Sequence, residues 1–283
     1  MNHDNMTESD RIANATRVRF GEPISAPADL PGTSELRRMA EHSSHRKWTP
    51  QPVDPALLKL LLACALSAPS KSDLQQADII NVADRAKIKA IADWIPDMPW
   101  ISNAPVFLVF CGNNRRIRQI GAWRGKGFVN EHLDHFMNAA VDAGIILSQF
   151  IRAAEAVGLG TVPISAVRNK PREISELLGL PDAVFPVAGL CVGYPLEAGY
   201  ISPRLQLDVT VHTDRYNEDG LKEKIDAYDQ RRHAVYPLRK QRYAKLYPDV
   251  AFNGWSEDKA RHYSVPERSD FGAFIRDKKF SLK

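Results

Sequence analysis

The sequence predicts an α+β fold of helices packed on a sheet. One observation is a continuous apolar run over residues 106–111, which suits a strand covered on both faces. Another is that helical patterns cluster early, at residues 33–41 and 54–66, while a long one over residues 131–157 stands alone. Helices and strands therefore alternate without the regular βαβ rhythm of a doubly wound fold, and a sandwich is favoured.

Local signals set the limits of these elements. Asp54 and Asp84 are good helix caps, and Pro55 suits a first helical turn. The helix after Asp54 is apolar on most sides, so we expect it to be buried. The long helix ends at Gly158-Leu-Gly160 and should cross the core. Further strands are expected over residues 78–82, 162–167 and 185–194, and further helices over residues 84–95 and 172–178.

The two ends of the chain are more polar than its centre. Residues 1–30 are polar and spotted with proline, and we expect an N-terminal arm that is ordered only when docked. After Pro203 the chain becomes more polar, and irregular structure is expected there. One domain is therefore predicted over residues 31–283.

Composition and charge exclude several classes of protein. The chain has 283 residues, 44% hydrophobic and 25% charged, and a net charge of +4. That charge is too small to argue for a nucleic-acid partner. No apolar run reaches the roughly 20 residues that span a bilayer, and the first ten residues do not resemble a signal peptide. Cys64, Cys111 and Cys191 lie in apolar segments, so buried free thiols in a reducing cytoplasm are expected.

Common catalytic motifs are missing. There is no glycine-rich dinucleotide or phosphate loop and no serine-hydrolase elbow. His132 and His135 lack further ligands for a metal, so we interpret them as surface or capping histidines and expect no metal.

Three polar loops can instead form an anion site. They are His42-Ser-Ser-His-Arg46, Ser70-Lys-Ser72 and Ser202-Pro-Arg204. If they converge, arginine and serine donors would cradle a phosphate. The alternative is that each is an ordinary polar surface loop.

The order of these segments resembles the nitroreductase family, over roughly residues 33–216. The segments that carry the resemblance are His42–Pro52, Ala65–Gln75, Gly158–Arg168, and Leu190–Pro195 followed by Ser202–Leu205. The polar C-terminal part is similar to the larger, flavin-reductase branch. The resemblance implies a mixed, mainly antiparallel sheet packed with helices, in a domain-intertwined homodimer that binds FMN within residues 31–283.

The resemblance also implies roles for individual residues. The FMN ligands it implies are His42, Ser43, Ser44, Arg46 and Arg204 toward the phosphate and ribityl chain; Ser70, Ser72 and Gln75 near the ring and ribityl hydroxyls; and Pro163, Ile164, Ser165 and Ala166 along the ring. Arg168 would lie near the ring and acceptor. Arg239 and Arg268 are candidates for holding nicotinamide phosphates or the acceptor, the alternative being solvated surface charges.

Some positions depart from the family pattern. Ser43 stands where the family usually has Arg, and Ser202 where it usually has Lys. Lys47, His45 or Lys71 are candidates to compensate; the alternatives are weaker FMN binding or a site adapted to another ligand. Met98 replaces an expected Gln, and Ser165-Ala166 replaces a Gly-Gly pair, which is tolerable because the ring needs backbone amides there.

The implied reaction transfers two electrons from NADPH or NADH through flavin N5 to a nitroaromatic, a quinone or a flavin. The flavin performs the chemistry, so no catalytic side chain is expected. Exchange of two ligands in one pocket predicts ping-pong kinetics. Two alternatives remain open: a specialised enzyme with a pathway-specific substrate, such as a dehalogenase, dehydrogenase or flavin-consuming enzyme, and a flavin-free binding protein.

Overall fold

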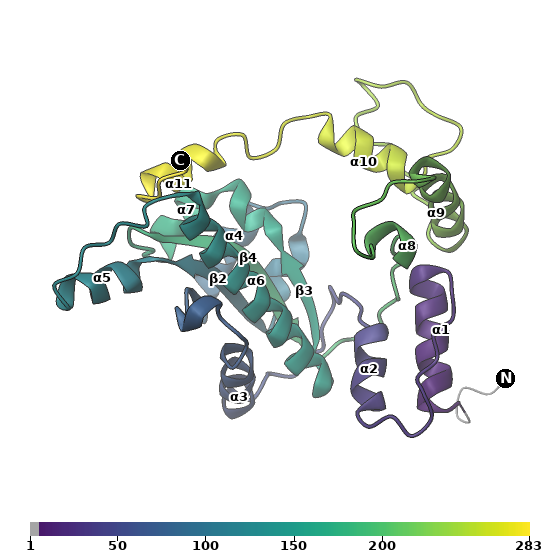
Figure 1. The fold of residues 1–283 in the computed structure, drawn as a ribbon, viewed down its shortest axis with the longest axis horizontal. Helices are drawn as coiled ribbons and strands as arrows, with labels where there is room; N and C mark the ends of the chain where they lie inside the picture. Colours follow the sequence, from purple (N-terminus) through teal and green to yellow (C-terminus); the bar gives the residue numbers. More distant parts are fainter. Residues whose placement is uncertain (1–5) are drawn as a thin grey trace. The chain divides into compact units, whose positions relative to one another are not determined.

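A computed structural model describes residues 6–283 of the chain. They divide into two compact units. The helical unit contains the described residues up to Ser43 together with Tyr200–Glu267, and the sheet unit contains Ser44–Gly199 together with Arg268–Lys283. Figure 1 traces the helices and strands of both units along the chain.

The sheet unit is built on one four-stranded antiparallel sheet. Its strands are β1 (Ala77–Asn81), β2 (Val106–Asn113), β3 (Gly160–Ile164) and β4 (Val184–Gly193), in the order β1-β2-β4-β3. Every neighbouring pair is antiparallel, with Ile79 opposite Phe110, and Phe107 and Val162 both opposite Cys191. The predicted α+β class is confirmed.

Side chains of β2 fill the core on both faces of the sheet. Phe107 and Val109 belong to one apolar cluster, whereas Leu108 and Phe110 belong to the other. Successive side chains of a strand point to opposite faces, so a strand that is covered twice reads as one continuous apolar run.

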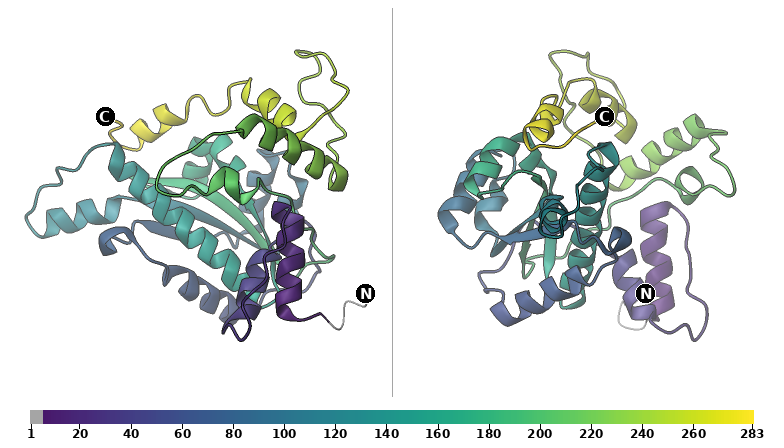
Figure 2. Two further views of the ribbon diagram at one scale, coloured as in Figure 1. Left: turned by 45° about the vertical axis from the view of Figure 1, so that its right-hand side comes forward. Right: turned by 60° about the vertical axis from the view of Figure 1, so that its left-hand side comes forward.

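Helices cover both faces. One cluster includes side chains of α4 (Arg85–Asp93), of the 3-10 turns η3 (Pro99–Asn103) and η4 (Ser165–Asn169), and of α7 (Pro171–Leu177). The other includes α3 (Pro55–Leu66) and α6 (Leu133–Ala156), which pack on each other. Figure 2 shows α6, the long teal helix, lying across the strands, as the sequence predicts. The unit is completed by η2 (Lys71–Asp73), α5 (Arg115–Trp123) and α11 (Phe271–Asp277).

The start of α3 is as predicted, but its burial is not. Asp54 accepts hydrogen bonds from the backbone N–H groups of Ala56 and Leu57 at 2.7 and 3.1 Å. Leu60 and Leu66 are 58% and 54% exposed. The helix was expected to be buried on most sides, yet only one stripe of it meets α6 and the sheet.

The helical unit contains five helices in the described part of the chain. They are α1 (Glu8–Phe20), α2 (Thr33–Ala40), α8 (Leu207–Thr210), α9 (Leu221–Val235) and α10 (Trp255–Tyr263). Within this unit α1 packs on α2, and α9 packs on α10. The irregular structure expected after Pro203 is therefore wrong for α9 and α10. Their buried faces carry few large apolar side chains, so the helical periodicity is weak in the sequence.

The expected N-terminal arm holds a well-capped helix. Thr7 and Asp10 form a reciprocal capping box at the start of α1, and Gly21 ends it with a φ of 92°. The buried side chains of α1 are mostly small, such as Ala13 and Ala15, so its sequence lacks the strong apolar stripe of most helices.

Two expectations about single residues are wrong. Cys64 is exposed on α3, whereas Cys111 and Cys191 are buried, and burial raises the pKa of Cys111 to about 12. His135 is buried, with Nδ1 2.9 Å from Asn114 Nδ2, and burial lowers its pKa. His132 is exposed before the first turn of α6. Among residues 6–283, no helix is long and apolar enough to cross a bilayer.

Candidate cofactor site

The loop that follows His42 and Ser43 runs along the first half of β3. Ser44 forms an isolated parallel bridge with Thr161, and the backbone N–H of His45 donates to the Thr161 carbonyl at 2.9 Å. A Cβ at Gly160 would lie 2.7 Å from His45 Cγ, so this close approach requires glycine. The part of His42–Pro52 that begins at Ser44 and the segment Gly158–Arg168 therefore lie side by side within the sheet unit.

The same loop also meets the end of β4. Thr49 N–H donates to the Tyr194 carbonyl at 2.8 Å, and Leu196 N–H donates to the Lys47 carbonyl at 3.1 Å. Trp48 forms a bridge with Pro195. Three of the four motifs are thus held together by backbone hydrogen bonds, which fix the path of the segment that carries Ser44 and Arg46.

Arg46 is exposed and stacks its guanidinium carbon 5.5 Å from the centre of the Trp100 ring. Stacking on an aromatic face orients the planar group and leaves its edge donors available. This geometry suits an arginine that receives a phosphate.

Residues 163–166 form the turn from β3 into η4. Pro163 and Ser165 are exposed, while Ile164 and Ala166 are buried. The outer surface of this turn therefore consists of the proline ring, the serine hydroxyl and backbone. The first N–H groups of a helical turn have no partner inside that turn, so the start of η4 can offer backbone donors.

Two arginines lie at this turn within the sheet unit. Arg168 donates to the Val187 carbonyl of β4, so part of its guanidinium is used to hold η4 against the sheet. Arg268 Nε donates to Asn169 Oδ1 at 2.6 Å, and its Nη2 lies 3.4 Å from Ser165 Oγ. A residue one hundred positions later in the chain thus reaches the predicted ring-binding segment.

The Ser70 loop is organised by a carboxylate that the sequence analysis missed. Asp142 of α6 is 2% exposed and accepts hydrogen bonds from Ser70 Oγ at 2.7 Å and from Lys71 N at 3.2 Å. Ser70 Oγ in turn accepts from Gln75 N at 2.8 Å. The Ser70 hydroxyl therefore serves the loop itself. An Asp in the middle of the apolar stretch of α6 was the available signal.

Ser72 and Gln75 are exposed in the same loop, and both have a φ of 51°. Such left-handed backbone at residues other than glycine is uncommon and persists only where the surroundings enforce it. Ser70 and Gln75 line a cavity of about 490 Å³, which Arg116 also borders. Arg116 holds the loop by donating to the Gln75 carbonyl at 2.5 Å.

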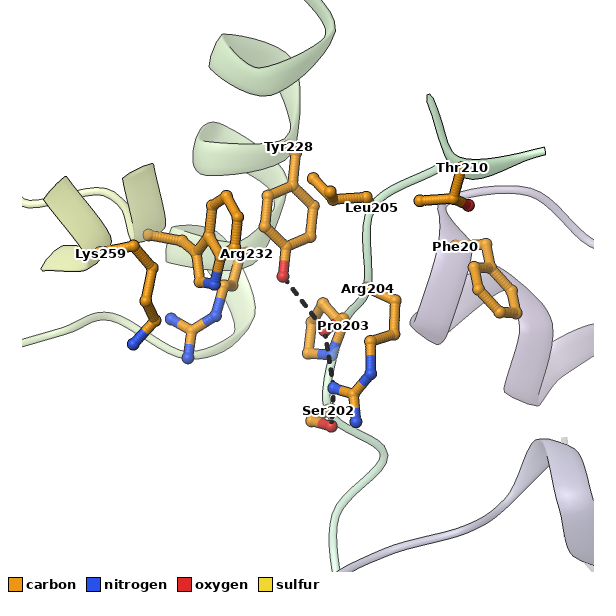
Figure 3. A pocket seen from close by; sticks show the side chains of 10 residues that line it. Phe20, Ser202, Pro203, Arg204, Leu205, Thr210, Tyr228, Arg232 and Lys259 are labelled. Atoms are coloured by element: carbon orange, nitrogen blue, oxygen red, sulfur yellow. Dashed lines mark hydrogen bonds between the residues drawn. The ribbon is translucent and has the colours of Figure 1, made fainter. Parts of the chain in front are cut away.

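In the helical unit, Arg204 borders a basic pocket of about 520 Å³. Figure 3 shows three cations, Arg204, Arg232 and Lys259, around this pocket, and no carboxylate is among its lining residues. Arg204 Nη1 donates to Ser202 Oγ at 2.6 Å, and Tyr228 donates to the Pro203 carbonyl at 3.1 Å. Lys259 is paired with Asp258 at 2.6 Å, so Arg204 and Arg232 are the cations that suit an anionic group here. Arg232 and Lys259 were not predicted, because nothing in their local sequence marks them.

The remaining predicted residues of the helical unit are His42, Ser43 and Arg239. His42 and Ser43 follow α2, and the His42 carbonyl accepts a hydrogen bond from Arg19 at 2.5 Å. Arg239 is exposed and borders a separate cavity of about 730 Å³ together with Arg242 and Asp258. The predicted residues are thus divided between the two units: Arg239 borders a cavity other than that of Arg204, and the Ser70 loop borders a third cavity.

Comparison with known proteins decides the family. The Nitroreductase family model matches residues 39–194, and the model of the family's C-terminal domain matches residues 202–283. The chain belongs to the nitroreductase family. This nitroreductase is 39% identical over 198 residues to the NAD(P)H FMN reductase of Bacillus subtilis, which covers 69% of this chain and 80% of that protein.

Solved structures agree with the family. NfrA2 of B. megaterium has a TM-score of 0.80 and 33% identity, covering 88% of this nitroreductase and 98% of that chain. The NADPH:FMN oxidoreductase of Vibrio harveyi, solved with NAD+, has a TM-score of 0.78 and 28% identity, covering 88% and 99%. The recognition made from the four motifs is confirmed.

The residues present in this nitroreductase fit a phosphorylated flavin. In the sheet unit Arg46, stacked on Trp100, offers a cation suited to a phosphate. In the helical unit the pocket at Arg204 offers cations of its own. At residues 163–166 the exposed side chains are a proline ring and a small hydroxyl, which a flat ring could approach. Of the residues named as candidates to compensate for Ser43 and Ser202, Lys47 is paired with Glu197 at 3.1 Å.

Proposed function

We propose that this chain is an NAD(P)H-dependent FMN oxidoreductase that transfers two electrons from a reduced nicotinamide to a nitroaromatic, a quinone or a flavin. The observation that carries the proposal is the loop of Ser44 and Arg46 hydrogen-bonded along β3, directly before the turn at residues 163–166. Support also comes from the relatives, which are named FMN reductase and NADPH:FMN oxidoreductase.

The proposed cofactor ligands divide by chemistry. Bound FMN supplies reversible two-electron chemistry, which explains why no catalytic side chain is required. The phosphate and ribityl ligands are His42, Ser43, Ser44, Arg46, Arg204, Ser70, Ser72 and Gln75. For Ser70 the proposal is narrower: because its hydroxyl already bonds Asp142 and Gln75, it acts mainly by shaping the loop.

The turn formed by Pro163, Ile164, Ser165 and Ala166 would hold the flat ring. Backbone donors of this turn and positive charge nearby would favour an anionic reduced ring, by the electrostatics that stabilise oxyanions. Arg268 supports this role, because it is anchored to Ser165 and Asn169. Arg168 would act at the same turn, on the side of the acceptor.

Arg239 is proposed to bind the phosphates of the nicotinamide. It is exposed and borders a cavity, and no hydrogen bond to its guanidinium is seen within residues 6–283. The solved Vibrio harveyi relative carries NAD+, which supports a nicotinamide as co-substrate. The abundance of arginine in the C-terminal part favours NADPH over NADH.

A homodimer is part of the proposal. Exposed apolar side chains occur on the packed helices α3 and α6, including Leu60 at 58%, Met137 at 59% and Val141 at 48%. Exposed apolar surface of this kind is typical of protein interfaces. A cytoplasmic location is proposed because all three cysteines are free thiols. The FMN-binding domain is assigned to residues 31–283, following an N-terminal segment of 30 residues.

Initial-rate kinetics test the function. NADPH oxidation is measured at several fixed concentrations of menadione or FMN. Parallel double-reciprocal lines are expected, because one pocket exchanges two ligands. Arg46→Gln should raise the FMN dissociation constant, while Lys89→Gln, at an exposed ion pair on α4, serves as the control. If the protein reduces neither menadione nor FMN, a specialised enzyme is favoured. If it does not bind flavin, the proposal is refuted.

A further inference from the structure

Helix α1 precedes the residues that the family model matches. That match begins at residue 39, while α1 covers Glu8–Phe20. The helix is nevertheless capped at both ends and packs on α2. The contacts of α1 within the helical unit show what this additional helix holds in place.

Arg19, in the last turn of α1, contacts two segments that are about 160 residues apart. It is 7% exposed. Its Nη2 donates to the His42 carbonyl at 2.5 Å, and its Nη1 donates to the Ser202 carbonyl at 3.1 Å. Nε and Nη2 both lie 3.2 Å from the Ala40 carbonyl at the end of α2. One planar guanidinium therefore joins the His42 segment to the Ser202 segment.

Backbone carbonyls of α1 also hold the segment that contains Ser202 and Arg204. The N–H of Arg204 donates to the Arg19 carbonyl at 2.6 Å. Arg231 of α9 donates through Nη1 to the carbonyls of Val18 and Arg19 at 3.2 and 3.3 Å, and through Nη2 to the Arg204 carbonyl at 2.5 Å. Gly21 allows this approach, because a Cβ there would lie 3.0 Å from Arg231 Nε. All of these contacts lie within the helical unit.

We propose that α1 is part of the phosphate end of the flavin site and that Arg19 is its positioning residue. The inference rests on the proposed function, in which His42, Ser43 and Arg204 are FMN ligands. Arg19 acts through them, since its donors hold the backbone on both sides while its charge stays buried. Charged donors form the stronger hydrogen bonds and fix ligating groups most firmly when they are buried.

Charge gives a second reason. Ser43 and Ser202 are uncharged, and Arg204 is the cation next to Ser202 in its segment. Arg19 places a guanidinium against the Ser202 carbonyl, next to the segment that carries Arg204. A positive charge in a site of low dielectric acts over a longer range than one in water. The N-terminal helix thereby adds positive potential at the Ser202 segment.

The test compares FMN with riboflavin, which lacks the phosphate. Each is titrated into flavin-free Arg19→Gln, Arg19→Lys and wild-type protein, and binding is followed by flavin fluorescence. Arg19→Gln should weaken FMN binding by at least about tenfold, which corresponds to about 1.4 kcal/mol. It should leave riboflavin binding within about twofold, because only the phosphate end is disturbed. Lysine keeps the charge but loses the planar fork, so Arg19→Lys should recover only part of the loss.

Arg17→Gln is the matched control, since Arg17 lies on the same helix and its guanidinium donates to Asn14 at 3.2 Å, within α1 itself. Equal FMN affinity in Arg19→Gln and wild type would overturn the inference, as would equal losses for FMN and riboflavin or full recovery with lysine. If Arg19→Gln does not fold, Arg231→Gln repeats the comparison with the same expected difference. Failure of the wild-type protein to bind FMN would instead refute the proposed function.

Discussion

Asp142 accepts a hydrogen bond from Ser70 Oγ at 2.7 Å, across 72 positions of sequence. The same carboxylate also accepts from the backbone N–H groups of Lys71 and Gln76 at 3.2 Å. A single buried charge on α6 therefore sets the conformation of a loop that is proposed to hold FMN.

Replacing this carboxylate should unfold the loop before the rest of the molecule. Asp142→Asn replaces one acceptor oxygen with a donor, which leaves buried donors of the Ser70 loop without a partner at a cost of about 1–3 kcal/mol. Urea unfolding should show that loss, and FMN should bind more weakly. Asp134→Asn, in the exposed first turn of α6, is the control. Wild-type stability in Asp142→Asn would contradict the assigned role.

Adding a cation at Ser202 should tighten FMN binding. Ser202→Lys places a charge beside Arg204, and attraction between lysine and a phosphate strengthens as salt is lowered. We expect a lower FMN dissociation constant, with a steeper dependence on NaCl than in wild type. Asn130→Lys adds the same charge at an exposed loop and should change neither quantity. An equal effect of both substitutions would show that net charge, rather than position, is responsible.

Arg239→Gln should separate NADPH from NADH. If the guanidinium binds the additional phosphate of NADPH, KM for NADPH rises about tenfold, the loss typical of a charged hydrogen bond, while kcat is unchanged. KM for NADH should stay near the wild-type value. Lys245→Gln removes one exposed charge from the same unit as a control. An equal rise in KM for NADPH and for NADH would show that Arg239 does not bind the additional phosphate.

The cysteines should react unequally with thiol reagents. Burial raises the pKa of Cys111 to about 12 and raises that of Cys191, whereas Cys64 is exposed. Folding holds the two buried thiols in the neutral form, so they stay unreactive, and their contribution to stability is lost only as the pH rises above the ordinary value of 9.0. A chromogenic disulfide at pH 8 should label one thiol per native chain and three after unfolding. Fast labelling of Cys64→Ser would contradict this.

The proposed homodimer predicts a defined mass change. Met137→Glu introduces a charge on the exposed side of α6, where burial against a second copy would be unfavourable. Light scattering should report a dimer for wild type and a shift toward monomer for Met137→Glu. Val129→Glu changes a residue that is 84% exposed outside the two helices and should stay dimeric. A monomeric wild type would contradict the proposal.

The sequence predicts the sheet unit well and the helical unit poorly, for a physical reason. β2 and α6 bury large apolar side chains of their own, such as Phe110 and Phe150, so their apolar patterns are visible in the sequence. Helix α1 is held instead by small side chains and by the hydrogen bonds of Arg19. Such contacts depend on carbonyl positions set by distant segments, and no local pattern reports them.

The residues of the candidate site also differ in how well their local sequence reveals them. Ser44 and Arg46 were recognisable because the family motif is contiguous in sequence. Asp142 and Arg231 act on these loops from other helices, so they become evident only when the chain is folded.

The absorption spectrum of the purified protein tests the central claim most directly. Flavin bands in the visible range are expected, either as isolated or after addition of FMN, and anaerobic NADPH should bleach them in proportion to the protein present. Protein that shows no visible bands, and that neither retains added FMN nor bleaches it with NADPH or NADH, would contradict the account.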